Sequence, residues 1–252
     1  MKLTSGPAVD GQRRIVLLAP LAASMPGLRF HTRPDRRHET LLADMQRLRG
    51  RLYLEDGAIL PSQLTFDGRH VQDADYRAWH LLLVDQDESV CGCARYLSHP
   101  ASVPFSALSV SRCPLAFSDR WGLRFRYAVE EEIAAARRDH LAYVEVGGWA
   151  LKPQLRYTSD ALRIAMASYG LAFMLGGCLG ISTVTHRHCS ASILRRIGGR
   201  PLEWDGTEMP SYFDPNYRCQ MEVLRFDSRK LNPRYLPLAR ELSAYLAASP
   251  VI

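Results

Sequence analysis

The chain has 252 residues, which is ample length for one sizeable hydrophobic core. An apolar fraction of 47% and a charged fraction of 23% are typical of a globular protein and exclude a disordered one. The net charge of +6 favours acidic partners, such as nucleic acid, anionic lipid, nucleotide phosphates or an acidic carrier protein. Because the arginines are scattered and no nucleic-acid-binding motif is present, we expect no nucleic-acid partner.

Cysteine usage and apolar runs bear on location. The six cysteines form no Cys-x-x-Cys pair and no disulfide-like spacing, which favours reduced thiols in a cytoplasmic protein. Residues 13–24 resemble a signal peptide, but Pro20 interrupts their short apolar run. Residues 164–184 are uncharged, yet their glycines and β-branched end favour a buried helix, a turn and a buried strand over a membrane span. We therefore expect no stable membrane insertion.

In the first half of the chain, residues 1–30 show no helical or strand periodicity, and we expect a tail or a covering arm there. From Arg36, apolar residues recur at helical spacing until Gly57. Residues 79–84 and 90–97 predict an antiparallel hairpin. The proline- and serine-rich segment that follows, up to residue 120, predicts a loop or lid.

The second half alternates strands and helices. Residues 124–139 predict a helix with acids early and arginines late, as the helix dipole favours. A strand at 143–151, a long apolar helix, a second strand, a short basic helix and a strand at 219–226 follow. This order indicates an α+β fold with a mixed, mostly antiparallel central sheet flanked by helices. We place this domain at residues 31–228 and expect the helix of 229–252 to pack on it.

The turn after the strand at 143–151 holds small polar residues, Thr158, Ser159 and Asp160. Backbone N–H groups at such a helix start can bind a pyrophosphate, and Lys152 and Arg156 would add positive charge. Thr158 or Ser159 would equally cap a helix without any ligand. The turn by itself leaves both interpretations open.

The run from Thr185 to Cys189 contains two alternate histidines and a cysteine, a pattern that can indicate a metal site or a Cys–His nucleophile. No third ligand lies at a recognisable spacing, so we predict no metal site. We expect the histidines at the edge of a cleft.

The order of elements around the turn resembles that of the GNAT acyltransferase superfamily. Its pyrophosphate loop reads Arg/Gln-x-x-Gly-x-Gly/Ala, and this chain has Arg156-x-x-Ser159-x-Ala161. Serine at the first glycine position leaves room for a donor that is held less by its pyrophosphate, such as an acyl group on acyl carrier protein. With the strand before the turn, the resemblance implies an acyl-donor site formed by Ala150, Leu151, Lys152, Arg156, Thr158, Ser159 and Asp160.

A more specific resemblance covers roughly residues 45–200. Its parts are Arg49 and Tyr53, Asp73 and Asp75 before a Trp-His-Leu-Leu run, Gly-Cys-Ala-Arg ending at Arg95, and Glu145. They look like the branch that contains acyl-homoserine lactone synthases, long-chain N-acyl amino acid synthases and exosortase-associated acyltransferases. That resemblance implies that these arginines and acids shape an amine-substrate pocket and the donor site. It also implies an acyl carrier protein thioester as the usual donor. The substrate-binding set is then Arg49, Tyr53, Asp73 and Asp75.

Aminolysis of a thioester needs a proton acceptor, a stabilised oxyanion and two reactants held together. Glu145 on the cleft strand is our candidate acceptor, with Arg95 as a second catalytic residue. Glu145 paired structurally with Arg95 across the sheet is an equal alternative. Backbone N–H groups near Ala150 or Leu151 are the natural oxyanion donors.

We therefore predict a cytoplasmic N-acyltransferase. It would move a long acyl group from acyl carrier protein or acyl-CoA to a small amine such as an amino acid. Its acyl thioester is a co-substrate, and we expect no permanently bound cofactor. Two alternatives stay open: an acetyl-CoA-dependent N-acetyltransferase, and a non-catalytic domain that only binds acyl groups.

Overall fold

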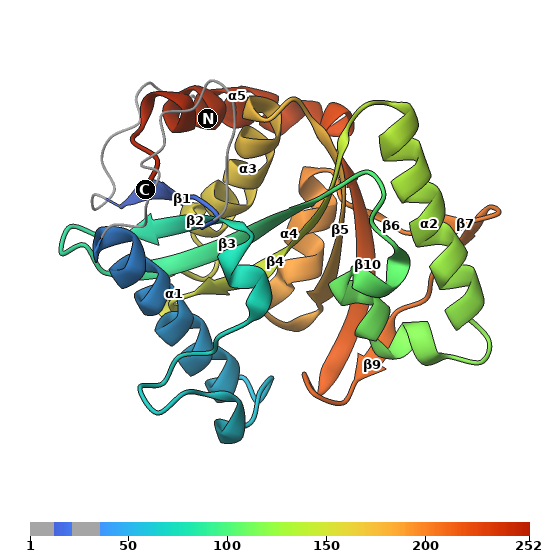
Figure 1. The fold of residues 1–252 in the computed structure, drawn as a ribbon, viewed down its shortest axis with the longest axis horizontal. Coiled ribbons are helices and arrows are strands. Elements are labelled where there is room, and N and C mark those ends of the chain that lie inside the picture. The colour runs from blue at the N-terminus through green and yellow to red at the C-terminus, as the bar shows by residue number, and fades with distance from the viewer. Residues whose placement is uncertain (1–12, 22–35) are drawn as a thin grey trace.

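The structure is a computed structural model that describes residues 13–21 and 36–252. Most strands form one mixed sheet (Figure 1), and β7 (Glu203–Trp204) and β8 (Thr207–Glu208) form a separate small hairpin. The strands of the large sheet are β1 (Arg14–Leu18), β2 (Trp79–Val84), β3 (Val90–His99), β4 (Ala142–Leu151), β5 (Cys178–Thr185), β6 (Arg200–Pro201), β9 (Tyr212–Asp214) and β10 (Cys219–Asp227). They lie in the order β1-β2-β3-β4-β5-β10-β6, with β9 paired to β10. Only β4 and β5 are parallel; the other neighbouring strands are antiparallel.

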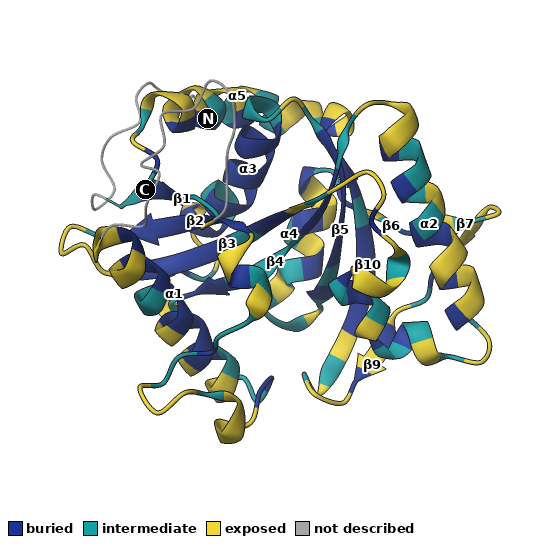
Figure 2. Ribbon diagram, viewed as in Figure 1, coloured by how far each residue is buried: buried dark blue, intermediate teal, exposed yellow. Residues whose placement is uncertain are grey.

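Helices cover both faces of this sheet (Figure 2). They are α1 (Arg36–Glu55), α2 (Gly122–Arg138), α3 (Ser159–Met174), α4 (Ser190–Ile197) and α5 (Leu236–Ala248). The first two bury separate apolar clusters on one face, while α3, α4 and α5 share a larger core on the other. Adjacent strand residues point to opposite faces, so Leu81 and Leu82 of β2 enter different cores. The predicted α+β class with a mixed, mostly antiparallel sheet is confirmed.

The first strand corrects the interpretation of residues 1–30 as a tail or arm. β1 pairs with β2 along its whole length and is an edge strand of the sheet. Ile15 and Leu17 enter the α3 core, whereas Val16 and Leu18 enter the α1 core. A strand buried on both faces is apolar throughout, so the alternation that marks a half-buried strand is absent. The rest of that segment, 1–12 and 22–30, lies outside the described residues.

The segment at 98–120 was predicted as a loop or lid. Its first two residues end β3, and three short 3-10 turns follow, at Phe105–Ala107, Ser109–Arg112 and Pro114–Phe117. Leu108 and Leu115 of this segment are buried in the α2 core. The segment is therefore a packed part of the fold.

Residues 164–184, the long uncharged stretch, form most of α3, a glycine turn and all of β5 except its last residue, as predicted. Within the described ranges, no helix has both the length and the apolar character needed to cross a bilayer. All six cysteines are free thiols.

The parallel pair at the centre of the sheet opens partway along. The β4–β5 register begins at Ala142 and Cys178 and stops at Glu145 and Ile181. β4 continues to Leu151 against β3, and β5 continues to its end against β10. Half of each strand therefore faces a gap, and the backbone N–H and C=O groups on that edge have no ladder partner there.

A bulge shapes the open half of β4. Cys93 pairs with Ala150 and Arg95 with Gly147, so Gly148 and Trp149 together oppose a single residue of β3. Gly148 has φ +61°, a left-handed backbone conformation. Such bulges often need this conformation, and glycine adopts it without steric cost. The bulge bends β4 beside the point where β5 leaves it.

Candidate active site

A cavity of about 830 Å³ lies at the gap between β4 and β5. Its walls include residues 146–151 of β4 and 182–185 of β5, the halves that do not pair. Other lining residues come from both faces of the sheet: Tyr53, Arg95 and Glu145 on the α1/α2 face, and Ala161 and Tyr169 on the α3 face. The cavity therefore passes through the sheet. Its size suits a small-molecule substrate.

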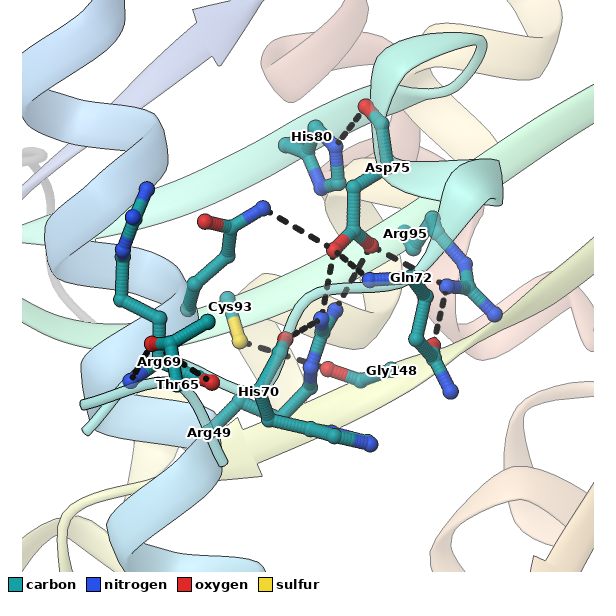
Figure 3. Close-up of polar contacts among 11 residues, drawn as sticks. Arg49, Thr65, Arg69, His70, Gln72, Asp75, His80, Cys93, Arg95 and Gly148 are labelled. Atoms are coloured by element: carbon teal, nitrogen blue, oxygen red, sulfur yellow. Dashed lines mark hydrogen bonds and ion pairs between the residues drawn. The ribbon is translucent and has the colours of Figure 1, made fainter. Parts of the chain in front are cut away.

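A buried ion pair between Arg49 and Asp75 lies next to residues that line the α1-facing part of the cavity. Figure 3 shows this pair and its polar contacts. Arg49 of α1 donates to both carboxylate oxygens of Asp75, with Nη1–Oδ1 at 2.9 Å and Nη2–Oδ2 at 2.6 Å. The two side chains are 1% and 0% exposed. Gln46 Nε2 and the Gln72 backbone N–H also donate to Asp75 Oδ2. Such a bidentate pair with further donors on the carboxylate is rigid.

Arg95 of β3 extends this network to the cavity wall. Its Nη1 donates to Asp75 Oδ1 at 3.2 Å and to Gln72 Oε1 at 2.6 Å. Its side chain is 12% exposed and lines the cavity, unlike Arg49 and Asp75. The geometry thus makes Arg49 and Asp75 positioning residues, and Arg95 the cation that a substrate can reach.

Charge keeps this network ionised. Burial would raise the pKa of the Asp75 carboxyl, but the hydrogen bonds and charge of Arg49, together with the charge of Arg95, lower that pKa to about 2. Burial also lowers the pKa of His80, whose Nε2 donates to the Asp75 carbonyl, to about 4. The imidazole of His80 is therefore neutral at physiological pH.

The buried imidazole predicts a pH dependence of stability. Its pKa is about 4 in the folded protein and 6.5 in the reference state. Between these values the unfolded chain binds the extra proton, so stability falls as the pH falls from 6.5 towards 4. The expected contribution of His80 is on the order of 3 kcal/mol. Urea unfolding across this pH range measures it.

His80→Gln keeps a donor for the Asp75 carbonyl and should flatten this slope. The matched control is His140→Asn, because His140 is exposed and asparagine tolerates its φ of +54°. Equal slopes for the wild type and His80→Gln would contradict the assignment.

Two other predicted substrate residues line the cavity. Tyr53 packs its ring at 5.8 Å from that of His70 and at 6.2 Å from that of Tyr217. Burial raises the pKa of the Tyr53 phenol well above its usual value, so it remains neutral. Asp73 is exposed at the cavity rim and has no ion-pair partner among the described residues. Its carboxylate is free to meet an amine.

Glu145 lines the cavity and is 7% exposed. Its partner is not Arg95, the alternative considered above. Its Oε2 contacts His99 Nε2 at 3.0 Å and the Ser109 hydroxyl at 3.3 Å, and its Oε1 accepts from the Val110 backbone N–H at 3.1 Å. Burial raises the pKa of Glu145, but these hydrogen bonds outweigh burial and leave the pKa below its usual value. Glu145 is an ionised, weakly basic carboxylate.

The predicted donor residues separate into two groups. Ala150, Leu151 and Arg156 line the cavity. The other four do not line it. The Lys152 ammonium lies 3.6 Å from Asp85, and the Asp160 carboxylate pairs with Arg13 and Arg163. Ser159 is the exposed first residue of α3, and Thr158 caps that helix by accepting a hydrogen bond from the Asp160 N–H at 3.2 Å. Thr158 thus acts as the helix cap considered above.

A polar cluster bridges the open ends of β4 and β5. Arg156, after β4, lies with Nη1 at 2.9 Å from His188 Nε2, after β5. Both reach Asp56 beyond α1, at 3.5 Å and 3.2 Å. Arg187 also donates to the Asp56 carbonyl. Of the two histidines predicted at the cleft edge, His188 lines the cavity, whereas His186 does not and lies 3.7 Å from the Glu222 carboxylate. No group of three or more His, Cys, Asp or Glu within the described part of the chain could hold a metal.

Sequence reasoning missed several residues around the cavity. Ser109 and Val110 hold Glu145 from the segment predicted as a lid, and Asp56 joins the cluster from the end of α1. The Val110 contact is a backbone N–H, which no sequence pattern reports. His80 lies in an apolar run of the sequence, and nothing in that run predicts its hydrogen bond to the Asp75 carbonyl.

A channel runs from the gap along α3. Ala161, Ala165, Ser168 and Ala172 lie three or four residues apart, on one helical face that lines the cavity. Across from them lie Val144 and Val146 of β4 and Cys178 of β5. Small side chains on the helix leave a channel between helix and sheet, and alanines line its end nearest the gap.

No protein-family model and no curated protein matches the chain. Solved structures do match. A CoA-dependent acyl-homoserine lactone synthase, BjaI, with MTA bound, is 16% identical over 95% of this chain and 92% of that chain, with a TM-score of 0.55. Another CoA-dependent acyl-homoserine lactone synthase, MesI, is 14% identical over 92% of this chain and 95% of that chain, at 0.55. FeeM, an N-acyl amino acid synthase from uncultured soil microbes, is 14% identical over 87% of this chain and 92% of that chain, at 0.51.

These matches define the class of fold. The chain has the fold of the acyl-homoserine lactone synthases and N-acyl amino acid synthases. The resemblance inferred from the sequence is therefore confirmed at the level of the fold.

Proposed function

We propose that the protein is an N-acyltransferase that forms an amide between a long acyl group and a small amine. One observation carries this proposal: a single cavity passes through the sheet where β4 and β5 stop pairing. It joins a charged pocket on one face to a mainly apolar channel on the other. Two unlike substrates can therefore meet at the exposed edge of β4.

The acceptor would lie on the charged face. Arg95, held by Asp75 and Gln72, would bind a carboxylate or another acidic group of the amine substrate, and Asp73 would face its ammonium. Arg49 and Asp75 would fix the position of Arg95 without touching the substrate. An amino acid or a derivative of one has the charges that fit.

The reaction would proceed by attack of the amine nitrogen on the thioester carbonyl carbon. Backbone N–H groups of 146–151 that face the gap would stabilise the oxyanion. The Leu151 N–H is one of these, because Lys152 N donates to Cys91 of β3 and successive N–H groups of a strand alternate in direction, whereas the Ala150 N–H faces β3. The C–S bond then breaks, and the thiolate leaves and is protonated. An α-amino group has a pKa of about 8, so part of it is already neutral at neutral pH and can attack. Attack makes the nitrogen far more acidic, so a weak base such as Glu145 suffices to take its proton, which then goes to the leaving thiolate.

The donor would be an acyl thioester carried by acyl carrier protein or coenzyme A, with its acyl chain along α3. BjaI, which shares this fold, is a CoA-dependent synthase and was solved with SAM and isopentyl-CoA. Arg156 is the donor-side cation at the cavity here. Lys152, Thr158, Ser159 and Asp160 would serve the donor only by shaping the turn that holds Arg156.

The test supplies purified protein with acyl-CoA and acyl carrier protein thioesters of increasing chain length and a panel of amino acids. Mass spectrometry should detect long-chain N-acyl amino acids. Arg95→Ala should lower the rate about a hundredfold because the acceptor is misplaced. Glu145→Ala should lower it about tenfold, near the low end for a general base, since the carboxylate is weakly basic.

Arg47→Ala is the matched control, because Arg47 lies on the exposed side of α1 and its ion pairs within 13–21 and 36–252 are with Asp44 and Asp67. Its rate should equal that of the wild type. Acetylated products alone would replace the proposal with the acetyl-CoA alternative. A retained acyl ligand with no product would replace it with the non-catalytic one.

A further inference from the structure

The channel along α3 is polar at its inner end. Ala161 lies beside the gap, and Ala172 lies eleven residues further along the helix, about 16 Å away at the rise of an α-helix. Ser168 lies between them, about 10 Å past Ala161. A channel for a plain hydrocarbon chain would be apolar along its whole length. This one is apolar only over its first half.

Three buried hydroxyls surround the inner end. The side-chain hydroxyls of Ser168, Tyr169 and Tyr96 have no hydrogen-bond partner among the residues that the structure describes, apart from the weakly bonding Cys178 thiol beside Tyr96. Their residues are 7%, 6% and 1% exposed, and all three line the cavity. Tyr96, Tyr169 and Cys178 belong to the same buried core between α3 and the sheet, and all three line the cavity.

Buried hydroxyls without partners are rare because each loses its hydrogen bonds to water. An empty channel can hold water against them, but a saturated chain that fills the channel displaces that water and leaves them unpaired. A ligand with an oxygen at this depth would satisfy them instead. Serine and tyrosine hydroxyls each donate and accept, so they match a ligand hydroxyl, which does the same.

We propose that the acyl group that this protein transfers bears a hydroxyl near its distal end, and that this hydroxyl binds between Ser168, Tyr169 and Tyr96. This inference rests on the proposed acyl transfer and names its donor class. The hydroxyl belongs at the far end of the chain because the thioester carbonyl would lie at β4, beside Ala161. A substituent next to the carbonyl would not reach Ser168.

The experiment compares ω-hydroxydecanoyl and decanoyl thioesters, each on coenzyme A and on acyl carrier protein, with the purified full chain. The wild type should prefer the hydroxylated donor by about tenfold in kcat/KM, as expected for one hydrogen bond in a buried site. Ser168→Ala and Tyr169→Phe remove a hydroxyl each and keep the shape of the channel. Each should reduce the preference, mainly by improving use of the plain chain. Calorimetry of ω-hydroxydecanoic and decanoic acid binding gives a readout that needs no turnover.

The outcomes separate this inference from the proposed function. Equal use of both thioesters, unchanged in the two variants, would overturn the distal hydroxyl and leave acyl transfer intact. Suppose that no donor supports transfer, but the wild type binds the hydroxy acid more tightly than the plain acid and the two variants do not. This result would overturn acyl transfer and would support the polar inner end of the channel as a hydroxyl-binding site. Equal binding of the two acids with no transfer would overturn both.

Discussion

Asp75→Ala should lower the free energy of unfolding by about 3–5 kcal/mol, the largest stability effect that we expect from one substitution. The change leaves the Arg49 guanidinium charged and buried, and among the residues with described positions it keeps the His70 carbonyl as its one acceptor. A buried charge without its counter-ion costs far more than the pair itself contributes. Urea unfolding at neutral pH measures the loss. Acyl transfer at a temperature where the variant is folded should also fall, because Arg95 loses its Asp75 contact.

Asp73→Ala is the matched control for this substitution, since it removes the same group two residues away. Asp73 is exposed, so its loss should change stability by less than about 0.5 kcal/mol. Asp73→Ala should still weaken binding of the amine substrate, which would be measured as a higher KM for the amine. If both variants lost the same stability, the assignment of Asp75 as the buried counter-ion would be wrong.

The central fold was predictable because its sequence signals are local. The apolar helix, the glycine turn and the β-branched strand of 159–185 each follow from spacing and composition, and the structure confirms all three. The hairpin of β2 and β3 is confirmed for the same reason, although β3 extends to His99. β1 was missed because a strand buried on both faces shows no alternation.

The contacts around the cavity were less predictable because they join segments that are distant in sequence. Arg156 and His188 are 32 residues apart, and both meet Asp56 from the end of α1. The partners of Glu145 come from a segment whose prolines and serines predicted only a loop. A resemblance can nominate Arg49, Asp75 and Arg95 together, but only the burial of each shows which one a substrate can reach.

Burial also changes the chemistry that a residue type suggests. A glutamate on a cleft strand suggests a general base, yet three donors hold Glu145 and lower its pKa. The catalytic contribution therefore shifts towards positioning by Arg95 and the open edge of β4. We therefore expect Arg95→Ala to lower the rate of acyl transfer more than Glu145→Ala does.

The acyl channel yields the prediction with the largest expected effect on activity. Ala165→Leu inserts a branched side chain into the channel one turn past Ala161. Transfer of a dodecanoyl group should fall about a hundredfold, equivalent to roughly 2.7 kcal/mol in the transition state, because the chain no longer passes α3. Transfer of a butyryl group should be unchanged, because a short chain ends before this point. Rates with a series of acyl-CoA lengths measure both.

Ala172→Leu provides the length calibration, because it lies seven residues further along α3, about 10 Å deeper. The Ala172→Leu variant should still transfer medium-length acyl chains and should exclude only the longest ones. The longest chain that each variant transfers should therefore differ by about this 10 Å. Melting temperatures of both variants check that the helix is intact. The same loss at every chain length, including butyryl, would indicate a damaged core and would place the acyl group elsewhere than along α3. A graded cut-off can arise only if the chain lies parallel to the helix, with its carbonyl at the open edge of β4.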